Sequence, residues 1–161
     1  VEAYRWPDDS ANHGCSGQTK RNKSMWGPPG HAYVYLCYGI HHLLNVVTQE
    51  EGIPSAVLIR GCEPLAGLEL IQKRRHPVSG TKLLDGPGKV GAALALNLSW
   101  DGHRLMEEGG LEFHSGPDVE HTLSGPRIGI DFAQANHRDA PWRLAIAGSP
   151  WVGHRRLLKK A

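Results

Sequence analysis

Turn-forming residues are so frequent in this sequence that its helices and strands are expected to be short. Twenty glycines and eleven prolines occur among the 161 residues, and both residue types interrupt helices and strands. We therefore expect many turns and short elements rather than a helical bundle. A chain of this length is typical of one domain, or of two small ones, and it is long enough to bury a sizeable core.

The composition is that of an ordinary soluble globular protein, with 40% apolar residues, 21% charged residues and a formal net charge of +2. It argues against a disordered chain, collagen and a coiled coil. No apolar run has the length of a membrane-spanning helix, and no signal peptide is visible. Cys15, Cys37 and Cys62 show no paired spacing, so a reduced compartment is expected. That compartment is the cytoplasm or nucleoid of a bacterium, or the nucleus of a eukaryote, and not the outside of the cell.

Basic residues are unevenly distributed along the chain, although the net charge is small. Residues 142–161 contain five lysines or arginines and no acidic residue, and 73–75 and 20–23 form two further basic clusters. Such clusters can neutralise the phosphates of a nucleic acid. The alternative interpretation is a set of solvated helix ends and a frayed tail.

Alternating residues predict a β-hairpin in the first third of the chain. In residues 31–37 the tyrosines and the cysteine fall on one face of a strand, and residues 40–48 can return as its partner. Tyr38-Gly39 suits the tip, because glycine tolerates positive φ. The other expected elements are a loop over 5–30, strands over 55–62, 111–113, 127–131 and 142–147, and helices over 64–76 and 88–98. This order predicts one α+β domain with a mostly antiparallel sheet.

Three glycines, Gly86, Gly88 and Gly91, match the G-x-G-x-x-G fingerprint of dinucleotide-binding proteins. That fingerprint requires a preceding strand and a surrounding βαβ unit, neither of which the sequence indicates. Pro87 also removes one backbone N–H from the loop. A nucleotide-cofactor site is therefore the weaker alternative, although a helix start beside Lys89 suits a single phosphate.

Ten histidines raise the question of a metal site. The H-E-x-x-H and C-x-x-C patterns are absent, and His41 and His42 are adjacent, so on a strand they point to opposite faces. The G-x-S-x-G pattern of a serine nucleophile is absent as well. We therefore expect no metal ion and no serine hydrolase site.

One group of residues suits recognition of a planar ligand such as a nucleobase. All four tyrosines lie within the first 38 residues, three of them around the expected hairpin. Glu2, His13, Asn45 and Arg60 add a carboxylate, an imidazole, an amide and a guanidinium. Aromatic side chains offer flat surfaces for stacking, and the polar groups can read a base edge. Each residue taken singly also has an ordinary structural interpretation as a core aromatic or an ion pair.

At these residues the sequence resembles the alkyladenine (3-methyladenine) DNA glycosylases. The similar segments are VEAYRWPDDSANH, QTKRNKSMWGPPGHAYVYLCYGIHHLLNVVT, PSAVLIRGCEP, LLDGPGKVGAALALN and AGSPWV. The resemblance implies a monomeric base-excision repair enzyme that needs no cofactor. It would bind double-stranded DNA and hydrolyse the N-glycosidic bond of an alkylated or deaminated purine. It also implies a curved antiparallel sheet with a protruding hairpin.

The resemblance implies a role for each matching residue. Glu2 would activate the attacking water, with Arg60 and the backbone carbonyl of Ile146 helping to hold that water. Gly88 and Lys89 are expected to contact the DNA backbone.

The remaining matches concern the base and the duplex. Tyr4 and Tyr35 would sandwich the flipped base, and His13 would contact its edge. Asn45 would discriminate among purines, and Tyr38 would wedge into the duplex. No lysine is placed as an imine-forming nucleophile, so we expect hydrolysis without strand cleavage.

Members of the family begin with a further segment before the position of Val1. Two functions therefore stay open at this point. One is a full glycosylase extending over residues 1–161, and the other is a catalytically weak or inactive module that binds damaged DNA.

Overall fold

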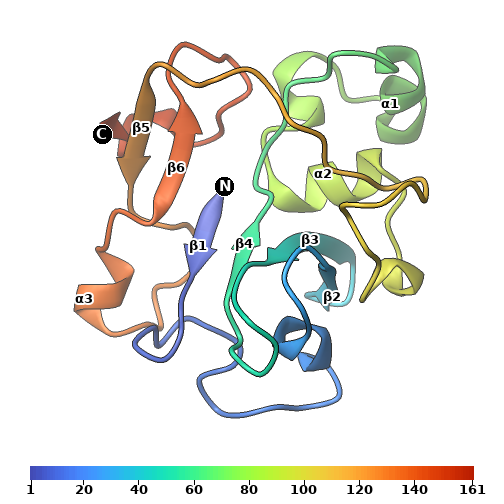
Figure 1. Cartoon of the computed structure of the whole chain (residues 1–161). Helices are drawn as coiled ribbons and strands as arrows, with labels where there is room; N and C mark the ends of the chain where they lie inside the picture. The colour runs from blue at the N-terminus through green and yellow to red at the C-terminus, as the bar shows by residue number, and fades with distance from the viewer.

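The computed structural model describes residues 1–161, and its hairpin is the one that the alternating sequence predicts (Figure 1). Strand β2 spans Ala32–Cys37, strand β3 spans His41–Val47, and the two pair in antiparallel fashion. Tyr38 and Gly39 turn the chain with φ angles of 51° and 71°. Glycine accepts this region, whereas an aromatic residue enters it only under strain. The tip residues Tyr38 and Ile40 are exposed.

Seven strands form one antiparallel sheet in the order β2-β3-β4-β1-β6-β5-β7. The further strands are β1 (Glu2–Tyr4), β4 (Ala56–Leu58), β5 (Thr122–Gly125), β6 (Arg143–Ile146) and β7 (Lys159–Lys160). The central position of β1 is visible in Figure 1, where it lies between β4 and β6. Glu2 stands opposite Leu58 on one side and Arg143 on the other. A residue at the start of the chain is therefore fully buried.

The helices are short, as the turn-rich sequence predicts. They are α1 (Leu68–Arg75), α2 (Pro87–Ala93) and α3 (Ala135–Arg138), with 3₁₀ turns at Lys23–Trp26, Gly80–Leu83, Leu98–Trp100 and Arg155–Leu157. Helix α2 packs on α1 and on β3 (Figure 1). A Cβ atom at Gly91 would overlap the backbone carbonyl oxygen of His42. Gly91 therefore allows α2 to approach the strand closely, which is a packing role.

The two faces of the hairpin are buried in different clusters. One face packs Val34 and Leu44 against Leu105. The other face packs Tyr33 and Val47 with residues that include Met25, Tyr4 and Tyr35. The alternation that builds the core thus also gathers three tyrosines on one side of the sheet.

The expected α+β class with an antiparallel sheet is confirmed, but several boundaries differ. Three expected elements are shorter in the structure. The strand expected over 55–62 is reduced to β4, and the helix expected over 64–76 is reduced to α1. The helix expected over 88–98 ends at Ala93, the last residue of α2. Ala95 has a φ of 54°, which is incompatible with a continued right-handed helix. The strand expected over 142–147 is β6.

No strand forms over 111–113 or 127–131. In the second segment Gly129 has a φ of 78°, and the Ile128 N–H donates to Glu2 rather than to a strand. The tail at Lys159 and Lys160 pairs with β5 instead of fraying. None of the helices has the length and apolar character needed to span a membrane.

Candidate active site

A cavity of about 750 Å³ lies beside the tyrosine-bearing face of the hairpin, and we call it the central cavity. Its wall comes from β1, the N-terminal loop, the hairpin, the start of α2 and the segment 128–132. The aromatic residues that line it are Tyr4, Tyr33, Tyr35, Tyr38 and Phe132, and the polar ones include His13, Asn45, Arg60 and Lys89. Flat aromatic surfaces with a few polar groups are suited to binding a planar polar molecule.

The Glu2 carboxylate lies behind the wall of this cavity and has no exposed surface. Its Oε1 accepts a hydrogen bond from the backbone N–H of Ile128 at 2.8 Å and lies 3.3 Å from Arg60 Nε. Its Oε2 accepts from the Tyr4 hydroxyl at 3.1 Å and from Arg60 Nη1 at 3.4 Å. All three partners line the cavity. A buried carboxylate with this many donors is held in one orientation.

Burial also sets the protonation of the groups around the carboxylate. Burial, followed by the nearby Glu2 charge, raises the pKa of the Tyr4 hydroxyl, so it remains a protonated donor at neutral pH. Burial, followed by Arg21, lowers the pKa of His13, so its ring is neutral at pH 7. The His13 Nδ1 atom lies 2.8 Å from the Tyr33 hydroxyl.

The aromatic residues divide between two sides of the site. Tyr35 stacks on Tyr33 with ring centroids 5.2 Å apart and meets the edge of His13 at 4.7 Å. The Tyr4 ring is covered on one side by the Arg127 guanidinium, 4.6 Å from its centroid. Tyr4 and Tyr35 line the same cavity without forming a ring–ring contact.

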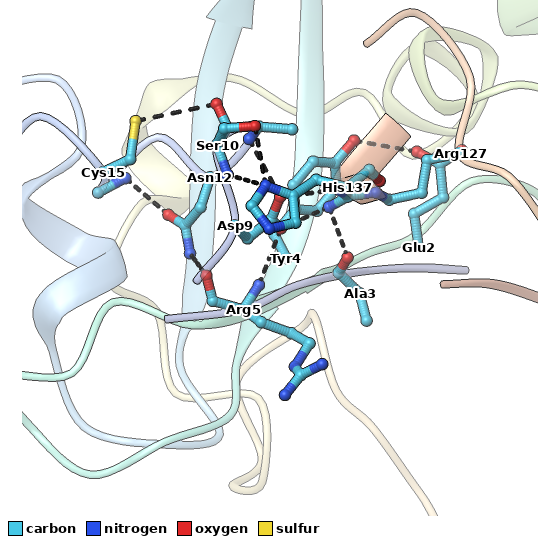
Figure 2. A network of polar contacts seen from close by, with 12 residues as sticks. Glu2, Ala3, Tyr4, Arg5, Asp9, Ser10, Asn12, Cys15, Arg127 and His137 are labelled. Carbon is cyan, nitrogen blue, oxygen red and sulfur yellow. Dashed lines mark hydrogen bonds and ion pairs between the residues drawn. The ribbon is translucent and has the colours of Figure 1, made fainter. Parts of the chain in front are cut away.

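A buried ion pair between Arg127 and Asp9 supports β1 (Figure 2). Arg127 donates to Asp9 through both terminal nitrogens, at 2.6 and 2.8 Å, and both side chains are fully buried. The guanidinium also donates to the backbone oxygens of Ala3 and His137. Arg127 therefore connects β1 to the segment that begins at Arg127 itself. The next residue of this segment, Ile128, donates the hydrogen bond that holds the Glu2 carboxylate.

Comparison with known proteins identifies the family of the chain. A profile of the methylpurine-DNA glycosylases matches residues 1–150. The chain belongs to this family. Methylpurine-DNA glycosylases are DNA repair enzymes, so the substrate of the chain is DNA.

Three relatives show how far the similarity extends. A protein of Nitrosococcus oceani assigned as a 3-methyladenine DNA glycosylase is 64% identical, over 99% of this chain and 79% of its own length. The DNA-3-methyladenine glycosylase of Arabidopsis thaliana is 53% identical over 94% of this chain, which spans 60% of that protein. A Methanocella arvoryzae protein with the same assignment as the first is 41% identical over 96% of this chain and 78% of its own length.

Most residues that the sequence singles out for this methylpurine-DNA glycosylase lie together. Asn45 is buried at the cavity wall, and its Nδ2 donates to the Tyr33 carbonyl at 3.0 Å. Tyr38 is 87% exposed at the hairpin tip and reaches the rim of the cavity. Gly88 and Lys89 also line the cavity, and the Lys89 ammonium is paired with Asp85.

Ile146 does not lie where the sequence comparison expects it. It is on β6 opposite Thr122, half exposed, and it lines a separate cavity of about 260 Å³. The main-chain group that contacts Glu2 belongs to Ile128 instead. Sequence reasoning missed Ile128 because 127–131 reads as a strand, and the only signal against that interpretation is Gly129.

The dinucleotide alternative is not supported by the geometry. All strand pairs are antiparallel, so α2 does not belong to a βαβ unit. Gly88 lies under the His41 ring and Gly91 under the His42 carbonyl, so both positions are filled by packing. No group of three or more His, Cys, Asp or Glu side chains is close enough to hold a metal ion.

Proposed function

We propose that the chain excises alkylated and deaminated purines from duplex DNA by hydrolysis of the N-glycosidic bond. The candidate substrates are 3-methyladenine, 7-methylguanine, hypoxanthine and ethenoadenine. One observation carries the proposal, which is the buried Glu2 carboxylate held by Arg60, Tyr4 and Ile128, three residues that line an aromatic cavity. The products are a free base and an abasic site.

The first step is extrusion of the damaged nucleotide, because a stacked base hides its glycosidic bond. Unstacking and unpairing cost roughly a few kcal/mol, and least for a damaged or mispaired base. Tyr38, held out at the hairpin tip, fills the gap left in the duplex. Each stack between a base and an aromatic ring contributes about 1–3 kcal/mol, so the wedge and the stacks on Tyr4 and Tyr35 offset the cost.

Hydrolysis then takes place at C1′ of the extruded nucleotide. Glu2 accepts a proton from water as the water oxygen bonds to C1′, and the C1′–N9 bond breaks with its electron pair leaving on the purine. The carboxylate also stabilises the positive charge that develops on the sugar. Arg60 and the backbone N–H of Ile128 keep Glu2 oriented.

Two residues are suited to reading the base itself. When the Tyr33 hydroxyl donates to Nδ1 of neutral His13, the ring proton is on Nε2, which becomes a donor for the base edge. Asn45 stands against the cavity with its amide fixed on the Tyr33 carbonyl. An immobile amide there conflicts with the 2-amino group of guanine and selects against the undamaged base. The 7-methylguanine base has the same amino group, but its positive charge makes it a much better leaving group, so it is still excised. Lys89 is the one lysine that lines the cavity, and its ammonium is paired with Asp85, which disfavours its use as a nucleophile for strand cleavage.

Wild-type protein incubated with duplexes that each contain one hypoxanthine or one ethenoadenine should release the free base. Chromatography of the released base and alkali cleavage of the abasic product measure this directly. An undamaged duplex is the control. Salt-dependent duplex binding with no base released at any enzyme excess would establish the alternative, a module that binds damaged DNA without catalysis.

Tyr38→Ala should weaken binding to a duplex with a central abasic analogue by about 5- to 150-fold. The expected loss corresponds to one aromatic stack of about 1–3 kcal/mol. Fluorescence anisotropy titration at fixed salt measures it, and Tyr38→Phe, which keeps the ring, serves as the control. Alanine and phenylalanine face the same backbone strain at this positive φ. Equal affinities of wild type and Tyr38→Ala would rule out the wedge.

A further inference from the structure

Exposed aromatic side chains occur at two places only, and both line the central cavity. The chain has five tryptophans, four tyrosines and two phenylalanines. Among them, Tyr38 and Phe132 are exposed, at 87% and 75%, and the other nine are buried or half-buried. The hairpin role of Tyr38 is part of the function proposed above. Phe132 has no role in it.

Phe132 is held outward by a fixed backbone rather than by a loose loop. The neighbouring residues Ile130 and Ala133 are buried against Ala11 and Tyr4. The Ala133 N–H donates to the Ile130 carbonyl at 2.9 Å. The Gln134 N–H donates to the Ser10 hydroxyl, also at 2.9 Å. Because the backbone on both sides of Phe132 is anchored, the ring stays outside the core. Its apolar surface therefore remains in contact with water in the free protein, which is unfavourable.

The surroundings of Phe132 indicate what kind of surface covers it. The segment 128–132 and the hairpin with Tyr38 both contribute to the wall of the cavity, so two exposed rings from distant parts of the fold line one cavity. Asp131 is exposed next to Phe132, and its carboxylate disfavours a phosphate at this place. The flat face of a nucleobase can stack on the Phe132 ring, whereas the negatively charged phosphate backbone of DNA is repelled by Asp131.

We propose that Phe132 is a second DNA-contacting aromatic residue. It stacks on the base next to the extruded nucleotide in the damaged strand, while Tyr38 fills the gap that the extruded base leaves. Phe132 thereby holds the strand at the cavity mouth. This inference rests on the proposed function, because it requires an extruded nucleotide in the central cavity.

The test is equilibrium binding of a duplex with a central abasic analogue, which needs no catalysis. Phe132→Ala should weaken binding by about tenfold, as expected for one lost stack. Phe132→Trp keeps an aromatic ring and should bind the duplex at least as tightly as wild type. The slope of log Kd against log salt should stay unchanged, because no phosphate contact is removed. Leu65→Ala is the matched control, since Leu65 is 98% exposed and does not line the cavity.

The outcomes separate this proposal from the proposed function. Wild-type protein that fails to bind the duplex would overturn both. Wild-type binding with Phe132→Ala within twofold of it would overturn only the role of Phe132. A smaller slope of log Kd against log salt for Phe132→Ala than for wild type would contradict stacking. Weaker binding by Phe132→Trp than by wild type would contradict it as well. A wild-type dimer that Phe132→Ala abolishes, with DNA affinity unchanged, would assign the ring to a second copy of the chain.

Discussion

Glu2→Gln should lower the single-turnover rate of base excision by roughly 10²- to 10⁴-fold, the range that a general base contributes. Glutamine keeps the size of the side chain but does not accept a proton from water. It also places an NH₂ group near Arg60 or near the Ile128 N–H, both of which are donors. Rates measured with saturating enzyme on a hypoxanthine duplex isolate this step from binding and product release.

Binding should be nearly unaffected by the same substitution, because the contacts proposed for DNA lie on Tyr38, Tyr4 and Tyr35. Glu107→Gln is the matched control, since Glu107 also pairs with an arginine, Arg104, but on the surface. It should excise at the wild-type rate. Undiminished excision by Glu2→Gln, with the variant folded, would remove Glu2 from the mechanism.

Local alternation accounts for the part of the fold that the sequence predicts well. In the hairpin, Tyr33 and Tyr35 are two residues apart on one strand, so their shared face follows from the strand period alone. The tip follows from Tyr38-Gly39 for the same local reason. Prediction is therefore most successful where each residue's environment is set by neighbours within a few positions.

Strand β1 shows where local reasoning stops. Its three residues carry no periodic pattern, and its partners at Leu58 and Arg143 are distant in the chain. The burial of Glu2 depends wholly on those partners. The resemblance to a family therefore singled out Glu2, whereas the sequence pattern could not show that it is ordered.

The main-chain partner of Glu2 has the same long-range character. Ile146 and Ile128 are both apolar residues near the end of the chain, and either one is a plausible contact in a linear sequence. The choice depends on Gly129, which turns the segment, and on Arg127, which anchors it 118 residues away from Asp9. No spacing rule links Arg127 to Asp9. The roles proposed for the site residues stay predictions, although the structure brings most of these residues to one cavity.

Arg127→Met should lower the free energy of unfolding by about 3–5 kcal/mol, the usual loss when one partner of a buried ion pair is removed. The substitution leaves the Asp9 carboxylate buried without its partner, and it removes the guanidinium that covers Tyr4. Urea denaturation followed by circular dichroism measures the change. Arg138→Met removes an arginine from a surface pair with Asp139 and should lower the free energy of unfolding far less, because water screens an exposed pair.

The double variant Asp9→Asn/Arg127→Met separates an unpaired charge from lost packing. It should recover more than half of the lost stability, because no buried charge is left without a partner. The Arg127 guanidinium lies over the rings of Tyr4 and Trp142, 4.6 and 5.0 Å from their centroids. A double variant no more stable than Arg127→Met would locate the effect in this packing rather than in the ion pair.

The pH dependence of stability gives an independent check on the same pair. Burial alone raises the pKa of Asp9, but hydrogen bonds from Arg127 and from the backbone N–H groups of Ala11 and Arg5 outweigh it, so the pKa is below its usual range. A lowered carboxyl pKa in the folded state stabilises the protein above the unfolded value, near pH 4, and this contribution is lost as the pH falls through the folded value. Without Arg127, its hydrogen bond and its charge no longer lower the pKa of Asp9, so the folded variant loses less stability than wild type when this carboxylate is protonated. The stability gap between wild type and Arg127→Met should therefore narrow below about pH 4, and a gap constant from pH 7 to pH 3 would contradict the ion pair as its source.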